Sequence, residues 1–125
     1  MSEQDTIIRQ GIGIKANDKE RPSVFRIRSG TLILTQTRLI WVQGGLTDNT
    51  YKNIAECEAD LQQKGGFDIP IAAIQGIESD YHRLFPFLGV AYTTEHGLAH
   101  CSFWSSEGDE LTSWFDALNL VLKQR

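Results

Sequence analysis

The sequence has 125 residues, enough for a single domain over residues 1–125 that buries about two-thirds of the surface its unfolded chain would expose. Its composition, 41% hydrophobic and 22% charged, excludes a wholly disordered chain. Two cysteines, Cys57 and Cys101, are too few for a disulfide framework. No apolar run reaches membrane-spanning length, and no apolar signal segment follows the polar first residues. These features favour a cytoplasmic protein.

The net charge of −4 is unevenly distributed along the chain. Residues 1–43 hold seven Lys and Arg against four Asp and Glu, a balance of +3, whereas residues 44–125 hold five against twelve, a balance of −7. General nucleic-acid binding needs many phosphate contacts from a basic domain, so we expect no nucleic-acid partner. A local basic site in the first third of the chain remains open.

The first third of the chain predicts strands. β-branched residues and glycines indicate a strand over residues 6–14, and a charged loop follows over residues 15–22. Period-two alternation predicts a strand over residues 24–28, and Gly30 predicts a bend or bulge. Two apolar runs then predict a hairpin, with strands at residues 31–35 and 39–42.

Two glycine pairs, at residues 44–45 and 65–66, bracket a segment of different character. It predicts a short helix that begins with a cap among residues 48–50 and ends near Gln63. Ile54, Cys57 and Leu61 form a single narrow apolar stripe on that helix. The segment of about residues 44–66 therefore resembles an insertion that lies on a sheet rather than a core element.

The remainder predicts four more strands and a strong helix. Strands are expected at residues 67–71, 74–78, 87–93 and 98–104, the first at a sheet edge because Pro70 cannot donate to a central ladder. Ser106 and Asp109 have the spacing of a helix cap. One apolar face follows: Leu111, Trp114, Phe115, Leu118 and Leu122. The predicted fold is α+β and mainly β, a seven-stranded antiparallel barrel or sandwich capped by one C-terminal amphipathic helix.

Residues 30–41, GTLILTQTRLIW, carry a resemblance to a known family. A glycine, a hydroxyl residue, three aliphatic residues and a polar turn precede Arg-Leu-Ile-Trp. This pattern resembles the signature hairpin of the GRAM and GLUE branches of the pleckstrin-homology (PH) superfamily, most closely the GLUE domain of the ESCRT-II endosomal sorting complex. Residues 71–78 and 101–103 and the last helix are also similar to that family, whereas residues 44–66 are longer than its usual connection.

The resemblance implies a non-enzymatic recognition module with a PH-like fold. GLUE domains bind ubiquitin and, in some members, phosphoinositides. The expected role is therefore ESCRT-type sorting of membrane proteins, with ubiquitin as partner and other ESCRT subunits as further partners if the chain is part of a longer protein. The expected location is cytoplasmic, with peripheral association on endosomal or other membranes. The hairpin itself is expected to be scaffold.

No residue pattern indicates an enzyme. Ser and His are present without a Gly-x-Ser-x-Gly motif, and the glycines of residues 11–13 lack the context of a nucleotide-binding loop. His96, His100 and Cys101 have partial zinc-ligand spacing, but a further ligand would have to be Cys57 or His82, without a Cys-x-x-Cys pair. We expect no catalytic residue, metal or cofactor.

The last helix also predicts a binding surface. At about 100° per residue, Leu120 lies almost opposite the apolar face. Ala117, Val121 and Ser113 lie beside it and Gln124 lies at the rim. These residues form a small apolar patch suited to weak ubiquitin binding, with an expected dissociation constant of about 10–500 μM. Two alternatives stay open: Leu120 is a lone exposed leucine, as is common on protein surfaces, or the helix packs on residues 44–66.

The alternative function is phosphoinositide or membrane binding. Many PH domains bind inositol phosphates with a first-loop Lys followed by Arg-x-Arg on the next strand. The matching residues are Lys19, Arg21, Arg26 and Arg28, with Arg83 from a later loop. Period two places Arg26 and Arg28 on one strand face, where they suit phosphate. Asp18, Glu20 and the net negative charge oppose this assignment.

Overall fold

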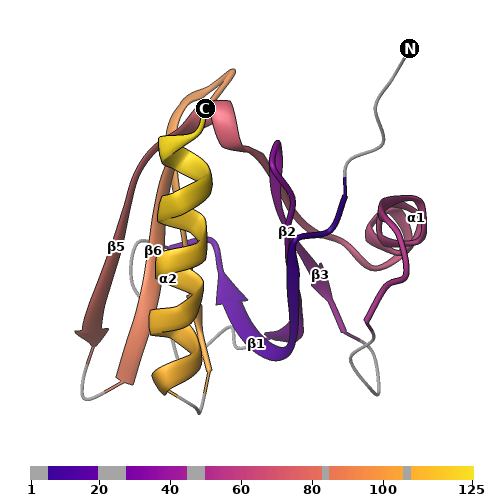
Figure 1. Cartoon of the computed structure of the whole chain (residues 1–125), viewed down its shortest axis with the longest axis horizontal. Helices are drawn as coiled ribbons and strands as arrows, with labels where there is room; N and C mark the ends of the chain where they lie inside the picture. Colours follow the sequence, from indigo (N-terminus) through magenta and orange to yellow (C-terminus); the bar gives the residue numbers. More distant parts are fainter. Residues whose placement is uncertain (1–5, 20–27, 45–49, 83–84, 106–107) are drawn as a thin grey trace.

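The computed structural model describes residues 6–19, 28–44, 50–82, 85–105 and 108–125. Its seven strands form one antiparallel sheet in the order β4-β3-β2-β1-β7-β6-β5 (Figure 1). The elements are β1 (Arg9–Asn17), β2 (Arg28–Leu34), β3 (Arg38–Gln43), α1 (Ile54–Lys64), β4 (Gly66–Pro70), the 3₁₀ turn η1 (Ile71–Ala73), β5 (Ile74–His82), β6 (Phe85–Thr94), β7 (Gly97–Trp104) and α2 (Gly108–Lys123). The expected mainly-β fold with a C-terminal helix is confirmed.

Strand β1 joins the two halves of the sheet. It pairs with β2 along its length and with β7 through its last three residues, where Lys15 lies opposite Trp104. Its register against β2 shifts between Gly11 and Ile14, and Gly13 has φ of 71°, which favours glycine. Figure 1 shows that β1 as a whole is strongly bent. The sequence-based boundary was wrong here, because β1 continues to Asn17, where a loop was expected.

The main hydrophobic core lies inside this curved sheet. It brings together side chains from all seven strands, from η1 and from α2. The indole of Trp114 on α2 is fully buried, and that of Trp41 on β3 donates a hydrogen bond of 2.9 Å to the backbone oxygen of Ile14. The two halves of the sheet and helix α2 therefore share one core, so the packing of each depends on the other two.

The apolar hairpin β2–β3 is buried on both faces. Leu32, Leu34 and Trp41 enter the main core, whereas Ile33 and Ile40 enter a second cluster beneath α1 on the opposite face. Side chains alternate between faces along a strand, so a strand covered on both sides needs apolar residues at every position. This explains the continuous apolar runs and confirms that the hairpin residues are structural.

Helix α1 covers the second cluster, and it begins later than the sequence pattern indicated. Its cap is Asn53, whose side-chain oxygen accepts a 3.0 Å hydrogen bond from the N–H of Glu56, so the cap expected within residues 48–50 is wrong. The predicted stripe is confirmed: Ile54 and Cys57 are buried and Leu61 packs against the cluster. The helix lies on the outside of the sheet, as expected for an insertion (Figure 1).

The motif glycine, Gly30, is required by a close approach of two strands. A Cβ atom at this position would lie 2.2 Å from the backbone oxygen of Val42 and 2.8 Å from the ring of Trp41. Any side chain would therefore push β2 away from β3. The bend expected at Gly30 is absent, because β2 runs through it from Arg28 to Leu34.

The predicted end of the strand at residues 74–78 was wrong, because β5 continues to His82 and pairs with β6 as far as Phe85. The other strands after residue 66 begin and end within two residues of the prediction. Strand β4 lies at one edge of the sheet, as Pro70 indicated, and β5 lies at the other. The predicted strand at residues 24–28 lies outside the described residues except for Arg28, as does the predicted cap at Ser106.

Candidate functional site

Helix α2 packs against the core largely through the face that the sequence indicated, with Val121 added to it. Leu111, Trp114, Leu118 and Val121 are buried, with exposed fractions of 5% or less. Phe115 and Leu122, which the prediction also placed on the apolar face, are half-buried and pack against the main core. The assignment of Val121 to the exposed patch is therefore wrong: residues 114, 118 and 121 form one row along the helix, and that row faces the sheet.

Leu120 is the exposed apolar residue of this helix. It is 59% exposed, as its position opposite the core face predicted. Ser113 and Ala117 beside it are half-buried, and Gln124 is exposed one turn further along. Asp116 and Lys123 lie within one turn on either side. The surface thus consists of one leucine among small and charged side chains.

The end of α2 is fixed by the last residue of the chain. The guanidinium Nη1 of Arg125 donates hydrogen bonds of 2.9 Å to the backbone oxygen of Ile71 and 2.7 Å to that of Ile74. Near the middle of the helix, the guanidinium of Arg9 lies over the Trp114 ring at 4.8 Å from its centroid. These contacts hold the helix, and with it Leu120, against β1 and the η1–β5 junction.

Two of the candidate lipid-binding residues flank the connection between β1 and β2. Lys19 and Arg28 are both exposed, and Arg28 donates a 2.9 Å hydrogen bond to the side-chain oxygen of Gln43. Arg28 also lines a hollow of about 200 Å³, together with Asp18 and Trp41. The rest of its lining is Ala16, Asn17, Gln43, Gly66 and Phe67. Arg21, Arg26 and Arg83 lie outside the described residues.

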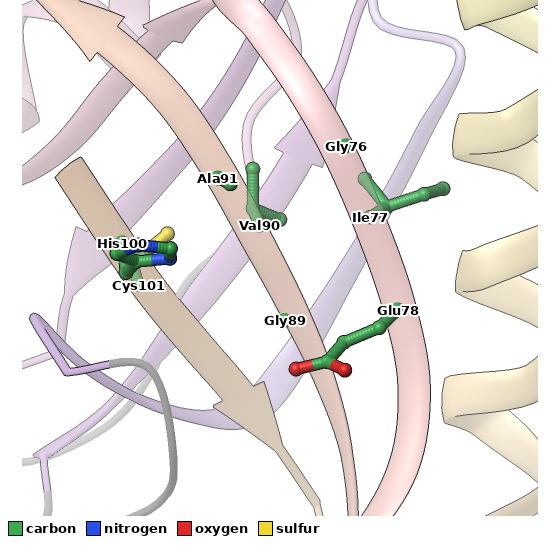
Figure 2. A pocket seen from close by; sticks show the side chains of 8 residues that line it. All are labelled: Gly76, Ile77, Glu78, Gly89, Val90, Ala91, His100 and Cys101. Carbon is green, nitrogen blue, oxygen red and sulfur yellow. The ribbon is translucent and has the colours of Figure 1, made fainter. Parts of the chain in front are cut away.

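A second hollow, which the sequence did not indicate, lies on strands β5, β6 and β7 (Figure 2). It measures about 200 Å³, and its lining residues are Gly76, Ile77, Glu78, Gly89, Val90, Ala91, His100 and Cys101. Gly76 and Ala91 are partners in the sheet, and so are Ala91 and His100. The signal in the sequence was the small residues at strand positions, and only the pairing of the strands shows that they adjoin.

The candidate zinc ligands do not converge. His96 is in the exposed β6–β7 turn, and His100 and Cys101 follow each other on β7, so their side chains point to opposite faces. Cys57 belongs to the other hydrophobic cluster, and the side chain of His82 lies outside the described residues. Within the described ranges, no three His, Cys, Asp or Glu residues are grouped as metal ligands.

Both thiols are buried and free. Burial raises the pKa of Cys57 to about 11, although the nearby Arg38 lowers it in part. Burial raises the pKa of Cys101 further still. Both therefore remain protonated at neutral pH, the form that is not nucleophilic.

Neither helix in the described part of the chain has the length and apolar character that a membrane crossing needs.

The comparisons with known proteins identify a shared fold. No protein-family model matches the sequence, and no curated protein matches it. Eleven chains of solved structures match. One of them, in "The 8S snRNP Assembly Intermediate", aligns with a TM-score of 0.66 over 100% of this chain and 88% of its own length, at 8% sequence identity. At that identity only the fold is shared: a curved, mainly antiparallel β structure with a C-terminal helix.

Proposed function

We propose that this chain is a GLUE-like recognition module that binds ubiquitin weakly through the exposed side of α2. The observation that carries the proposal is the position of Leu120, 59% exposed on a helix whose other large apolar side chains are buried or half-buried. The surface comprises Leu120 with Ser113, Ala117 and Gln124, and Val121 is excluded from it because of its burial. The hairpin resemblance to GLUE domains supports ubiquitin as the partner, and ESCRT-type sorting as the setting.

The proposed surface is small, so the affinity is low. One leucine with flanking small residues buries little area, and association costs several kcal/mol of lost freedom, which leaves a dissociation constant of about 10–500 μM. The balance of −7 over residues 44–125 steers the domain towards a basic surface on the partner. We therefore expect binding to weaken moderately as the salt concentration rises.

The test is a titration of isotopically labelled protein with ubiquitin, followed by NMR. Shifts are expected at Leu120, Ala117 and Gln124. Leu120→Asp should abolish binding and leave the fold intact, because the side chain is exposed. Leu118→Asp is the matched control: it places a carboxylate at a position that is 0% exposed and should unfold the domain.

Two outcomes contradict the proposal. Normal affinity in a folded Leu120→Asp variant rules out the surface. An absence of shifts in the wild-type protein at millimolar ubiquitin rules out the function.

The hollow beside Arg28 favours a second candidate, binding of a phosphoinositide headgroup. Arg28 is exposed and lines that hollow, and Lys19 is exposed two residues beyond the end of β1. A guanidinium suits bidentate contacts with phosphate. Asp18 in the same lining opposes an anion. Sedimentation with phosphoinositide vesicles should fail for Arg28→Glu and persist for Lys123→Glu, an exposed lysine at the end of α2. A wild-type protein that stays in solution at low salt excludes this candidate.

A further inference from the structure

The two edges of the sheet are not equivalent. Edge strand β4 has five residues and ends in Pro70, and its Asp68 is held by Arg38 of the neighbouring strand at 2.6 Å and 3.0 Å. Edge strand β5 has nine residues and contains no proline, and in the described ranges it pairs only with β6. An edge strand offers unpaired N–H and C=O groups to any extended chain. Among the residues that the structure describes, the β5 edge is therefore the one open to a further strand (Figure 1).

The side chains of β5 differ between its two faces. Glu78 and Asp80 are exposed on one face, where the strand has no Lys or Arg to balance them. Ile77 and Tyr81 lie on the other face; Ile77 packs against the main core, and Tyr81 is 66% exposed, a large aromatic surface in contact with solvent. Figure 2 shows Ile77 and Glu78 pointing in different directions from the strand, Ile77 towards the helix. One face of β5 is acidic, and the other carries Ile77 and Tyr81 with the uncharged Ser79 between them.

The second hollow extends the acidic face. Its floor includes Gly76 and its partner Ala91, and its borders include Glu78 and His100. A Cβ added at Gly76 would meet no atom within 4 Å, so this floor is open space rather than packed core. The methylene stem of a lysine or arginine could lie on such a floor while its charged end reaches Glu78.

We propose that the β5 edge binds an extended segment of a partner protein as an eighth strand, with basic residues alternating with apolar ones in that segment. Main-chain hydrogen bonds to β5 supply affinity, and alternate side chains supply specificity. The basic residues face Glu78, Asp80 and the second hollow, and the apolar residues face Ile77 and Tyr81. This surface is distinct from Leu120 on α2, so the inference is independent of ubiquitin binding.

The same charges argue against a second copy of this chain as the occupant. Two β5 strands paired edge to edge would bring Glu78 and Asp80 of one copy close to the same acidic residues of the other. Like charges across neighbouring strands are destabilising, whereas opposite charges stabilise the pair. The edge is therefore adapted to a basic partner and protected from self-association.

The probe is a fluorescent twelve-residue peptide in which lysine alternates with valine. Its binding to the whole chain is measured by fluorescence anisotropy at low salt, and NMR shifts of the labelled protein locate the site. A peptide with the same sequence, N-methylated at its four central amides, tests for main-chain hydrogen bonds. Shifts are expected along β5 and β6, and N-methylation should eliminate binding.

Protein variants test the charges and the hollow separately. The double substitution Glu78→Lys and Asp80→Lys should weaken binding about tenfold or more, because two complementary charges become repulsive. Gly76→Val fills the hollow without a clash and should weaken binding several-fold. Leu120→Asp is the matched control and should bind the peptide like wild type.

The proposal would be overturned if the N-methylated peptide bound as tightly as the unmodified one, or if no binding were seen at millimolar peptide. NMR shifts centred on α2, or unchanged affinity in the folded double variant, would also overturn it. A β5-mediated dimer in sedimentation equilibrium, dissociated by Glu78→Lys with Asp80→Lys, would assign the edge to self-association and would equally overturn it.

Discussion

The two helices of this protein are attached to the same sheet in different ways. Helix α2, sixteen residues long, inserts a row of fully buried side chains, including Trp114 and Leu118, into the main core. Helix α1, eleven residues long, buries only Ile54 and Cys57 in a small cluster on the opposite face. The stabilisation from the hydrophobic effect scales with the apolar area that is buried. Helix α2 is therefore held mainly by the hydrophobic effect, and α1 has much less of that stabilisation.

Polar contacts around α1 supply stabilisation that its small apolar cluster does not. The side chain of Gln10 on β1 makes two hydrogen bonds of 2.8 Å to the backbone N–H and C=O of Tyr51, just before the helix. The hydroxyl of Tyr51 donates a 2.5 Å hydrogen bond to Asp60. Arg38, already paired with Asp68, also lies 3.6 Å from Glu58 of the helix. A helix held this way is expected to open locally, whereas α2 should be released only by global unfolding.

Each helix has its own thiol reporter for this comparison. Cys57 is buried in the cluster beneath α1, and Cys101 is buried in the main core on β7. A thiol reagent reaches either sulfur only after the surrounding structure opens. We therefore expect Cys57 to react faster than Cys101, and equal rates would contradict the proposed difference between the helices.

The largest effect should come from Trp114→Ala in α2. Removing a fully buried indole leaves a large cavity, and such substitutions cost about 3–5 kcal/mol of the free energy of unfolding. The urea midpoint should fall, and both cysteines should become reactive together, because the main core connects both halves of the sheet. A loss of less than about 1 kcal/mol would show that α2 is not integral to the core.

A smaller and local effect is expected from Gln10→Ala. It removes both hydrogen bonds to the Tyr51 backbone, with an expected cost of about 1–3 kcal/mol. Labelling of Cys57 should accelerate about tenfold or more, while labelling of Cys101 stays near its wild-type rate. If both rates rise equally, α1 and the main core unfold as one unit.

The smallest effect is expected from Tyr51→Phe, which should change how the free energy of unfolding depends on pH. The hydrogen bond from Tyr51, assisted by Lys64, lowers the pKa of Asp60 below its ordinary value of 3.8. A lowered folded-state pKa stabilises the protein above the unfolded-state pKa, and this contribution is lost as the pH falls through the folded-state pKa. Tyr51→Phe should therefore be less stable than wild type near pH 7, and the difference should narrow below about pH 4.

Urea titrations of both proteins between pH 3 and pH 7 provide that measurement. A stability difference that is constant over this range would mean that Tyr51 acts through packing alone. Lys64→Gln, which removes the 3.0 Å ion pair with Asp60, is a control that should show a weaker trend in the same direction.

Local sequence patterns were sufficient to predict most elements. Alternation and apolar runs located the β2–β3 hairpin and the strands after residue 66, Pro70 indicated an edge strand, and the stripe at Ile54 and Cys57 indicated a helix lying on a sheet. These features depend on backbone preferences and near neighbours, which the sequence carries directly. The exposure of Leu120 also followed from helical periodicity alone.

The tertiary structure decided the remaining features, because each depends on contacts between distant segments. Which row of α2 faces the sheet depends on how its side chains meet those of β5 and β6, so Val121 is buried although it lies beside the exposed leucine. The hollow at Gly76 and Ala91 exists because β5 pairs with β6 in one register. The open edge at β5 follows from the strand order, which joins the halves through β1 and β7. Periodicity describes one segment at a time, whereas burial, hollows and edges arise only when separate segments pack together.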